Sequence, residues 1–210
     1  MVKLTKRLNA VASLVSLGSS VADVGCDHGY VPVYLVKNNI AASCVAMDIN
    51  EKPLASCERL VKEEMLEERI KTRISNGLEK LEKGECDTVI IAGMGGELIV
   101  DIISRCSFSN ELHFILQPMT HPEYVRKYLY DNGYEIYNDF IVNEGKHLYS
   151  VFDTKYTGKI TPKTQKDYFL GNIKDFSQKK YFLHLLNYLN NKAKSGVDLT
   201  EVISAVEEIL

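Results

Sequence analysis

The sequence contains no apolar run that approaches the roughly 20 residues needed for a helix to cross a membrane, so we expect no membrane association. Basic residues at the N-terminus precede an apolar stretch, which superficially resembles a cleavable signal. Polar residues interrupt that stretch, however, and Leu4, Leu8 and Val11 recur at the spacing of an amphipathic helix. A surface helix is therefore the better interpretation.

Cysteine is present in an odd number and without a pattern. The five cysteines include no C-x-x-C pair and lie mostly in apolar surroundings, and the five histidines lack the spacing of metal ligands. These features argue against a disulfide scaffold and against a zinc site. We therefore expect reduced, buried thiols, no bound metal and a cytoplasmic protein.

A length of 210 residues suits one well-filled core with a small appendage. We place an α/β domain at residues 1–157 and a helical extension at 158–210, and we expect a monomer. The net charge of −3 conceals an asymmetry, because residues 155–195 carry nine lysines and only two aspartates. A basic segment beside an acidic body is typical of proteins that bind polyanions.

Short apolar runs alternate with helical patterns along most of the chain, which predicts a parallel sheet covered on both faces. The expected strands cover residues 20–24, 43–48, 71–75, 86–92 and 111–117. The clearest helix covers 51–69, and an antiparallel hairpin pairs 134–142 with 147–156. This order indicates a Rossmann-like, seven-stranded α/β sheet of the class I methyltransferase type, because a dinucleotide-binding dehydrogenase would continue with βα units.

The C-terminal segment predicts two further helices. Residues 158–162 have the composition of a linker, and apolar residues then recur at helical spacing on either side of Gly196. Asp198 and Glu201 have the spacing of a capping box at the start of the second helix. So short a connection predicts that the two helices pack as an antiparallel hairpin.

The segment 23–30, Asp-Val-Gly-Cys-Asp-His-Gly-Tyr, directly follows the first expected strand and precedes a helix. Its glycines permit a tight turn in which the backbone approaches a ligand closely. The spacing is not G-x-G-x-x-G, because Asp27 stands where a dinucleotide site has its second glycine and would repel a pyrophosphate. A carboxylate tolerates an ammonium and a sulfonium, so the segment favours S-adenosylmethionine over NAD or FAD.

Further polar residues follow the next two expected strands. Asp48 is placed to bind a ribose diol, and Asn76-Gly77 is placed to contact an adenine edge. Each has an alternative, since Asp48 can cap the helix that begins at Glu51 and Asn-Gly is an ordinary turn dipeptide. Together with the segment 23–30 they favour a cofactor site. The candidate cofactor-binding residues are Asp23, Gly25, Asp27, His28, Gly29, Tyr30, Asp48, Ile49, Asn76, Gly77, Ala92, Gly93 and Met94.

The segment 92–97, Ala-Gly-Met-Gly-Gly-Glu, follows the fourth expected strand, where methyltransferases hold the target atom. The Asp-Pro-Pro-Tyr sequence of amino-directed DNA enzymes is absent at this place. Three glycines in four residues suit a simple loop, but a wall of small residues also admits a flat base. Gln117 and Pro118 end the fifth strand and would line the same crevice, because open α/β sheets bind ligands at the carboxyl ends of their strands.

Four motifs together carry a resemblance to a known family. They are Leu4-Thr5-Lys6-Arg7-Leu8, Asp23-Val24-Gly25-Cys26-Asp27-His28-Gly29-Tyr30, Ala92-Gly93-Met94-Gly95-Gly96 and Leu116-Gln117-Pro118. In this order they closely resemble the bacterial tRNA (adenine-22-N1)-methyltransferase family over nearly the whole chain. The resemblance implies a class I fold, S-adenosylmethionine as methyl donor, and methylation of N1 of an adenine in the D-arm region of tRNA.

The implied reaction assigns roles to three candidate catalytic residues. N1 of neutral adenine has a lone pair, so methyl transfer needs positioning and desolvation more than proton removal. The product stays cationic until N6 releases a proton, and Asp27 or Glu97 would stabilise that charge or accept the proton. His28 is the third candidate, although a histidine in a ligand loop more often orients the loop.

The target base must leave its stack because N1 lies on the Watson–Crick edge, and lysines of the extension would follow the phosphate backbone. The candidate substrate-binding residues are Arg7, Tyr30, Gly95, Gly96, Gln117, Pro118, Lys179 and Lys180. Two other functions stay open. One is methylation of a small molecule, and the other is RNA binding without catalysis by a chain with a degenerate cofactor pocket.

Overall fold

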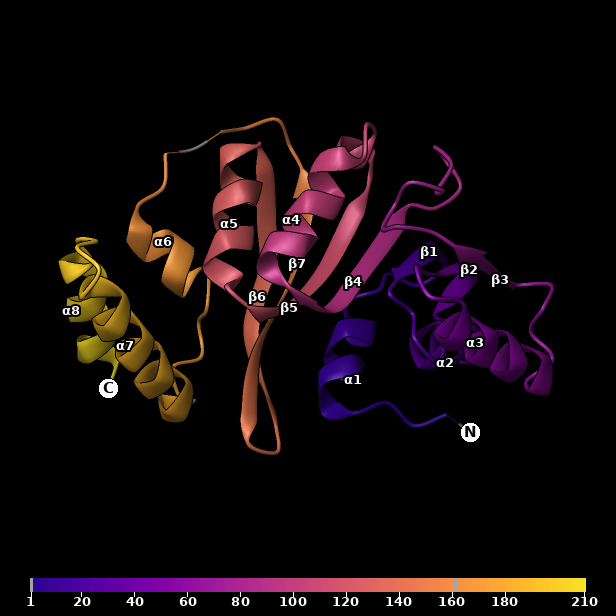
Figure 1. The fold of residues 1–210 in the computed structure, drawn as a ribbon, viewed down its shortest axis with the longest axis horizontal. Helices are drawn as coiled ribbons and strands as arrows, with labels where there is room; N and C mark the ends of the chain where they lie inside the picture. The colour runs from indigo at the N-terminus through magenta and orange to yellow at the C-terminus, as the bar shows by residue number, and fades with distance from the viewer. Residues whose placement is uncertain (1, 161) are drawn as a thin grey trace.

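The computed structural model describes residues 2–160 and 162–210, which form one seven-stranded sheet, helices on both of its faces and a helical extension at one end (Figure 1). The strands are β1 (Ser19–Val24), β2 (Ala41–Asp48), β3 (Ile70–Ile74), β4 (Thr88–Gly95), β5 (His113–Thr120), β6 (Tyr134–Glu144) and β7 (His147–Tyr156). The helices are α1 (Lys6–Ser13), α2 (Tyr30–Lys37), α3 (Glu51–Glu63), α4 (Gly96–Arg105), α5 (Pro122–Asp131), α6 (Gln165–Leu170), α7 (Lys179–Ala193) and α8 (Thr200–Ile209), and a 3₁₀ helix, η1, covers Ser109–Glu111. In these two ranges no helix is both long and apolar enough to cross a membrane.

The strand order is β3-β2-β1-β4-β5-β7-β6, and β7 runs antiparallel to both of its neighbours whereas the other pairs are parallel. This confirms the predicted sheet with its closing antiparallel hairpin. The chain builds β2 and β3 on one side of β1 and then returns to place β4 on the other side. The carboxyl ends of β1 and β4 therefore flank a topological switch point, where open α/β sheets bind ligands.

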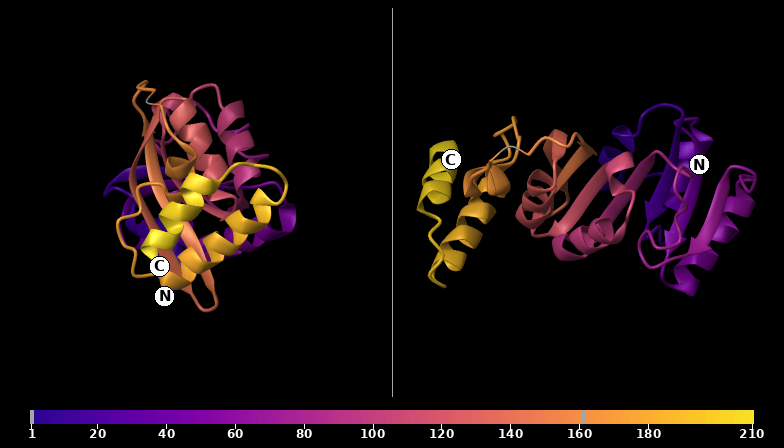
Figure 2. Two further views of the ribbon diagram at one scale, coloured as in Figure 1. Left: turned by 90° about the vertical axis from the view of Figure 1, so that its left-hand side faces the viewer. Right: turned by 90° about the horizontal axis from the view of Figure 1, so that it is seen from above.

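Consecutive residues of the central strands pack on opposite faces of the sheet. In β1, Val21 belongs to the buried cluster formed with α1, α2 and α3, and Ala22 belongs to the cluster formed with α4 and α5. Figure 2 shows these helices on either side of the sheet. Strands covered on both faces are apolar throughout, which explains why short continuous apolar runs predicted them.

Two predicted boundaries differ from the structure in the first part of the chain. The helix predicted for 51–69 ends at Glu63, because the chain reverses through Met65, whose φ of 55° is left-handed, before it enters β3. The fourth strand continues to Gly95, beyond its predicted end at residue 92. Most of residues 92–97, the glycine-rich segment, is therefore strand rather than loop.

The extension has an apolar cluster of its own, built by α6, α7 and α8 around Phe182, Leu189 and Val206. The predicted pair of packed helices is present, and Gly196 lies in their connection with a left-handed φ of 89°. The predicted capping box at Asp198 is wrong, because Asp198 Oδ1 accepts its hydrogen bonds from the backbone N and the hydroxyl of Thr200. The division of the chain at residue 157 stays a prediction.

A buried ion pair joins the extension to the sheet. Arg126 of α5 is fully buried, and its Nε and Nη2 each donate to one carboxylate oxygen of Asp139 in β6, at 2.9 Å. Its Nη1 donates to the carbonyl oxygens of Tyr168 (3.2 Å) and Phe169 (3.3 Å) in α6. A charge this deep in the protein is tolerated only when it is paired and hydrogen-bonded. Arg126 therefore couples the position of α6 to that of the sheet.

Candidate active site

The loop between β1 and α2 forms one wall of a cavity at the carboxyl ends of the parallel strands. Gly25 and Gly29 have φ angles of 73° and 74°, a left-handed conformation that favours glycine. A Cβ on Gly25 would lie 2.4 Å from Met94 Cε, and a Cβ on Gly29 would lie 2.3 Å from Cys57 Sγ. Both glycines are therefore required by conformation and by close packing.

Two buried carboxylates lie at the ends of β1 and β2. Asp48 Oδ2 accepts a hydrogen bond from the backbone N of Asp27 (3.3 Å), and its Oδ1 accepts one from the backbone N of Asn50 (2.8 Å). Asp48 thus connects the two loops, and its contacts are not those of an N-cap of α3. Burial, together with the charge of Asp48, raises the pKa of Asp23 to about 7. Such a pair suits a cationic ligand.

The cavity has a volume of about 240 Å³ and is bounded by the start of α1, the β1–α2 loop and the end of β4. It brings together the predicted residues Arg7, Asp23, Gly25, Asp27, His28, Tyr30, Ala92 and Gly93. The predicted residues that follow β2 and β3 lie outside its lining. The cavity is therefore built mainly at the switch point between β1 and β4.

The predicted residues at the ends of β2 and β3 have other contacts. Ile49 is 60% exposed, and the Asn76 side chain donates to Glu79 Oε1 (2.9 Å). Gly77 has a left-handed φ of 61°, and a Cβ there would lie 2.9 Å from Ile102 Cγ1. These residues lie at the same edge of the sheet as the cavity but do not line it. Their part in cofactor binding stays a prediction.

Arg7 reaches from α1 to the end of β5. Its Nη1 donates to Gln117 Oε1 (2.5 Å), which also accepts from the backbone N of Gly93 (3.1 Å), and Gln117 Nε2 donates to the Pro118 carbonyl oxygen (2.9 Å). The backbone N of Arg7 donates to Glu144 Oε2 in β6 (2.7 Å). Gln117 is fully buried, so its amide fixes both Arg7 and the glycine-rich segment.

The last two glycines of that segment differ in their surroundings. Gly96 is buried, and a Cβ there would lie 2.4 Å from the His121 carbonyl oxygen, so this glycine lets α4 begin against the β5–α5 turn. A Cβ on Gly95 would lie 3.3 Å from Thr120 Oγ1. Packing accounts for Gly96, and Gly95 is the more open of the two. Their contact with a substrate stays a prediction.

The three candidate catalytic residues do not all line the cavity. Asp27 and His28 both line the cavity, with His28 Nε2 3.7 Å from Asp27 Oδ1 and the His28 ring 5.7 Å from that of Tyr30. Glu97 lies outside the cavity in the first turn of α4, where its Oε1 is 2.9 Å from His121 Nδ1. Sequence reasoning missed His121 because this histidine is isolated in the sequence.

The predicted lysines lie at the start of α7, away from the cavity lining. Lys180 Nζ donates to the Lys146 carbonyl oxygen in the β6–β7 turn (3.3 Å), and Lys179 Nζ donates to the carbonyl oxygen of Ile209. Over the parts of the chain that the structure describes, no three histidine, cysteine or acidic side chains are grouped to hold a metal ion.

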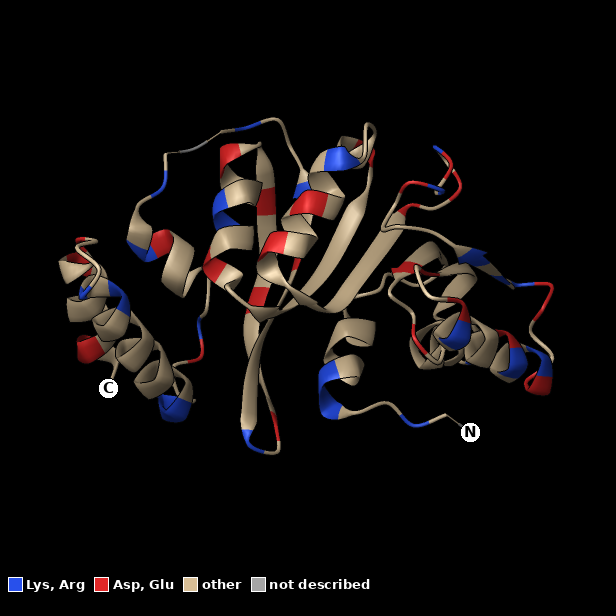
Figure 3. Ribbon diagram, viewed as in Figure 1, with Lys and Arg blue, Asp and Glu red and all other residues tan. Residues whose placement is uncertain are grey.

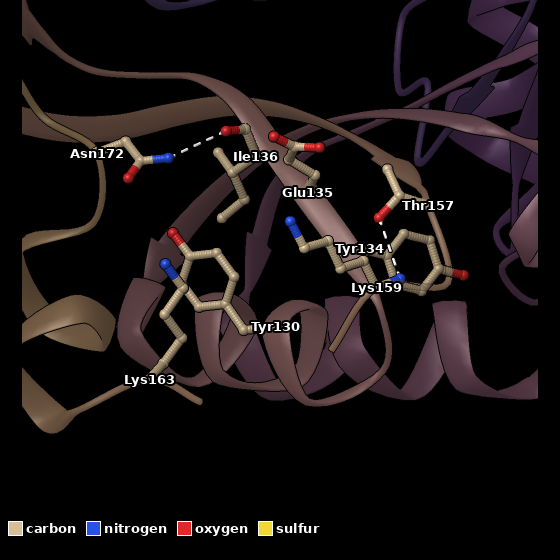
Figure 4. Close-up of a pocket in the computed structure, with 8 residues that line it drawn as sticks. All are labelled: Tyr130, Tyr134, Glu135, Ile136, Thr157, Lys159, Lys163 and Asn172. Carbon is tan, nitrogen blue, oxygen red and sulfur yellow. Dashed lines mark hydrogen bonds between the residues drawn. The ribbon is translucent and has the colours of Figure 1, made fainter. Parts of the chain in front are cut away.

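A second cavity, of about 150 Å³, lies at the opposite edge of the sheet (Figure 4). Tyr134 at the start of β6 and Thr157 just after β7 line it, and β7 ends beside the start of β5. Lys163 also lines it, with Nζ 4.8 Å from the centre of the Tyr130 ring. None of the predicted site residues belongs to this cavity.

Comparison with known proteins identifies relatives of the chain. The methyltransferase domain family matches residues 4–152. The tRNA (adenine(22)-N(1))-methyltransferase of Bacillus subtilis is 38% identical over 151 residues, which cover 71% of this chain. The match spans 63% of that enzyme, which is less than two thirds of its length.

Solved structures extend the similarity to the whole fold. A Streptococcus pneumoniae protein in complex with S-adenosyl-L-methionine is 29% identical, with a TM-score of 0.89 and coverage of 99% of this chain and 100% of that one. The M. capricolum TrmK in complex with S-adenosyl-homocysteine is 26% identical, with a TM-score of 0.80 and coverage of 98% and 96%. The chain therefore belongs to the methyltransferase domain family, and its predicted resemblance to the tRNA (adenine-22-N1)-methyltransferases is confirmed.

Proposed function

We propose that this protein transfers a methyl group from S-adenosylmethionine to N1 of the adenine at position 22 of tRNA. The observation that carries the proposal is one cavity, at the switch point of the sheet, that joins the Asp23–Tyr30 loop to the glycine-rich end of β4. The similarity to a tRNA (adenine(22)-N(1))-methyltransferase supports the choice of substrate.

The residues of the cavity fit S-adenosylmethionine. Gly93 lines the cavity, and the nearest atom to a Cβ there would be Arg7 Nη1 at 3.5 Å, so this glycine leaves room for a ligand. The buried Asp23 of the cavity suits an ammonium group, and the buried Asp48, which holds the cavity loop at Asp27, suits a ribose diol. Asp27 disfavours a pyrophosphate. When bound, the cofactor supplies a methyl group whose bond to a positively charged sulfur breaks as the adenine lone pair forms the new bond.

The protein has two tasks at the base, to hold it and to manage the charge of the product. Tyr30 lines the cavity and is placed to stack on a flipped base, and Arg7 has N–H donors beyond the one that binds Gln117. Methylation at N1 leaves a cation until N6 loses a proton. Asp27 and Glu97 are the carboxylates at this edge that can stabilise the cation or take the proton.

Basic residues gather along the edge of the sheet that holds the cavity. Figure 3 shows Lys and Arg at the start of α1, in the β6–β7 turn and at the start of α7. These three places are in contact, because the backbone N of Arg7 donates to Glu144 and Lys180 donates to the Lys146 carbonyl oxygen. The resulting basic edge suits a phosphate backbone whose exposed base enters the cavity.

The proposal is tested by incubating the protein with unmodified tRNA and isotope-labelled S-adenosylmethionine and mapping the product by mass spectrometry of nuclease digests. The expected product is 1-methyladenine at position 22. Binding of the cofactor without methylation of any tRNA would instead favour a small-molecule methyltransferase. Binding of tRNA without binding of the cofactor would favour an RNA-binding module.

Neutralising the lysines at the start of α7 is expected to flatten the salt dependence of tRNA binding. With Lys179→Gln and Lys180→Gln together, the slope of log Kd against log salt should fall by about 1 for each phosphate that the protein no longer neutralises. Fluorescence anisotropy at a series of salt concentrations measures the slope. A Lys62→Gln and Lys71→Gln protein, changed at the far end of the sheet, is the control, and equal slopes in all three proteins would move the RNA surface elsewhere.

Cofactor affinity is expected to rise with pH up to about 7 and then to level off, because Asp23 must be ionised to face a cation. The sign follows from the raised pKa of Asp23, which leaves the carboxyl protonated in the free protein below about pH 7. Binding therefore releases a proton in that range. Calorimetry in buffers of different ionisation enthalpy measures the release, and Asp23→Asn should abolish it. Identical proton release in both proteins would contradict the prediction.

A further inference from the structure

A groove of about 350 Å³, distinct from the cavity at the switch point, lies between the β5–α5 turn, the turn end of the β6–β7 hairpin and α7. Its volume is at the small end of the range for ligand pockets. Figure 1 shows α7 on the outer side of α6 and α5 at this end of the molecule. The groove therefore lies where the extension meets the α/β part of the chain.

The groove opens at the same sheet edge as the cofactor cavity. It begins directly where β5 ends, at Met119 and Thr120, and the cavity is lined by the neighbouring strand β4 near its own carboxyl end. His121 lines the groove, and its Nδ1 lies 2.9 Å from Glu97 Oε1 in the first turn after the glycine-rich segment. The Glu97–His121 pair thus lies between the groove and the end of β4.

Side chains with flat or polarisable surfaces line the groove. Tyr181, His184 and Tyr188 lie on one stripe of α7, at positions i, i+3 and i+7, and Met119 is 43% exposed. The rings of His121 and Tyr188 are 6.3 Å apart and inclined at 49°, so they do not stack face to face. Aromatic faces and a thioether in a slot of this size suit a nucleobase, because every base has a π-face that stacks on such groups.

Hydrogen bonds hold the tyrosines of the groove in place. The Tyr188 hydroxyl donates to the buried Glu123 Oε1 (2.8 Å) and accepts from Lys192 Nζ (3.1 Å). The Tyr181 hydroxyl shares a hydrogen bond with Ser150 Oγ (3.2 Å). Rings fixed before a ligand arrives lose little conformational entropy on binding. The groove is therefore built before any ligand binds.

We propose that this groove binds a second, unpaired nucleobase of the substrate RNA, adjacent in sequence to the methylated adenine. The inference rests on the proposed function, since it takes the RNA from there. The basic edge continues into the groove, because Tyr181 follows Lys179 and Lys180 directly on α7 and Leu148 follows the β6–β7 turn. A strand whose phosphates follow these lysines brings one base to the cavity and its neighbour to the groove.

The test combines groove variants with abasic RNA. The groove protein carries Met119→Ala and His184→Ala, and the control protein carries Leu183→Ala and His147→Ala, which change exposed residues outside the groove. Each protein is titrated with intact tRNA and with tRNA that is abasic on the 5′ or the 3′ side of the target adenine. S-adenosylmethionine affinity, measured by calorimetry, and circular dichroism should be unchanged in both variants.

The expected result is that one abasic site weakens tRNA binding to the wild-type and control proteins by about 5- to 150-fold, the range for one stacked base, and weakens binding to the groove protein far less. Equal effects of the abasic sites in all three proteins, with adenine methylation intact, would contradict the binding of a base in the groove. The proposed function would not be affected by that result. Absence of methyl transfer to any tRNA would contradict both the proposed function and the proposed role of the groove. Altered sedimentation of the groove protein with unchanged tRNA affinity would assign the groove to a second copy of the chain and also overturn the proposal.

Discussion

Replacement of Arg126 by methionine is expected to lower the free energy of unfolding by about 3–5 kcal/mol, the cost of breaking a buried ion pair by removing one partner. The substitution leaves the Asp139 carboxylate fully buried without its counter-charge, and it removes the donor to the carbonyl oxygens of Tyr168 and Phe169. Those carbonyls belong to α6, so the extension should also detach more readily. Chemical denaturation followed by circular dichroism measures the loss, and limited proteolysis detects detachment.

The next residue on the same helix provides a matched control. Lys127 forms an exposed pair with Asp131, at 2.5 Å, and Lys127→Met should cost no more than about 1 kcal/mol. The double variant Arg126→Met with Asp139→Leu should recover part of the loss, because no charge is then left buried. Equal destabilisation by Arg126→Met and Lys127→Met would show that the buried pair does not couple the extension to the sheet.

Replacement of Asp48 by alanine is expected to raise the Kd for S-adenosylmethionine by roughly 10- to 100-fold, the effect of losing one or two hydrogen bonds to a carboxylate. The side chain lies at the end of β2 and holds the backbone N of Asp27 and of Asn50. The change therefore removes the proposed partner of the ribose and also releases the β1–α2 loop at Asp27. Isothermal titration calorimetry measures the affinity, and the affinity for tRNA should change little.

Two companion variants separate these effects. Asp48→Asn keeps one hydrogen-bond acceptor in the same place, so it should lie between the wild type and Asp48→Ala. Asp101→Ala removes an exposed carboxylate from α4 and should leave cofactor affinity unchanged. An Asp48→Ala protein that binds the cofactor with the wild-type Kd would remove Asp48 from the site.

Much of the fold could be predicted because its signals are local. The apolar runs at 43–48 and 111–117 read as strands buried on both faces, and the hairpin at 134–156 has the composition of two strands around a turn. The ends of helices and strands were harder to predict from the sequence. The end of α3 at Glu63 depends on a left-handed conformation at Met65. Residues other than glycine rarely adopt that conformation, so a methionine in the sequence does not predict it.

The candidate site could be predicted where its residues are close together in the sequence. The loop after β1 could be found because glycine and aspartate at fixed spacing directly follow a strand, and the structure brings that loop to the cavity. The connection of Arg7 to Gln117 could not be found, since 110 residues separate the two and only the assembled sheet brings them together. His121 was missed for the same reason, because it lies in the β5–α5 turn and its partner Glu97 lies in the first turn of α4.

The hydrogen bond from the backbone N of Arg7 to Glu144 has a consequence for the nascent chain. The first helix completes the cavity wall, yet it packs on the closing hairpin, where Val11 shares a buried cluster with Val151. Helix α1 is synthesised before β6 and β7, which supply part of the surface on which it packs. The packing of α1 that completes the cavity wall is therefore finished only after β6 and β7 have been translated.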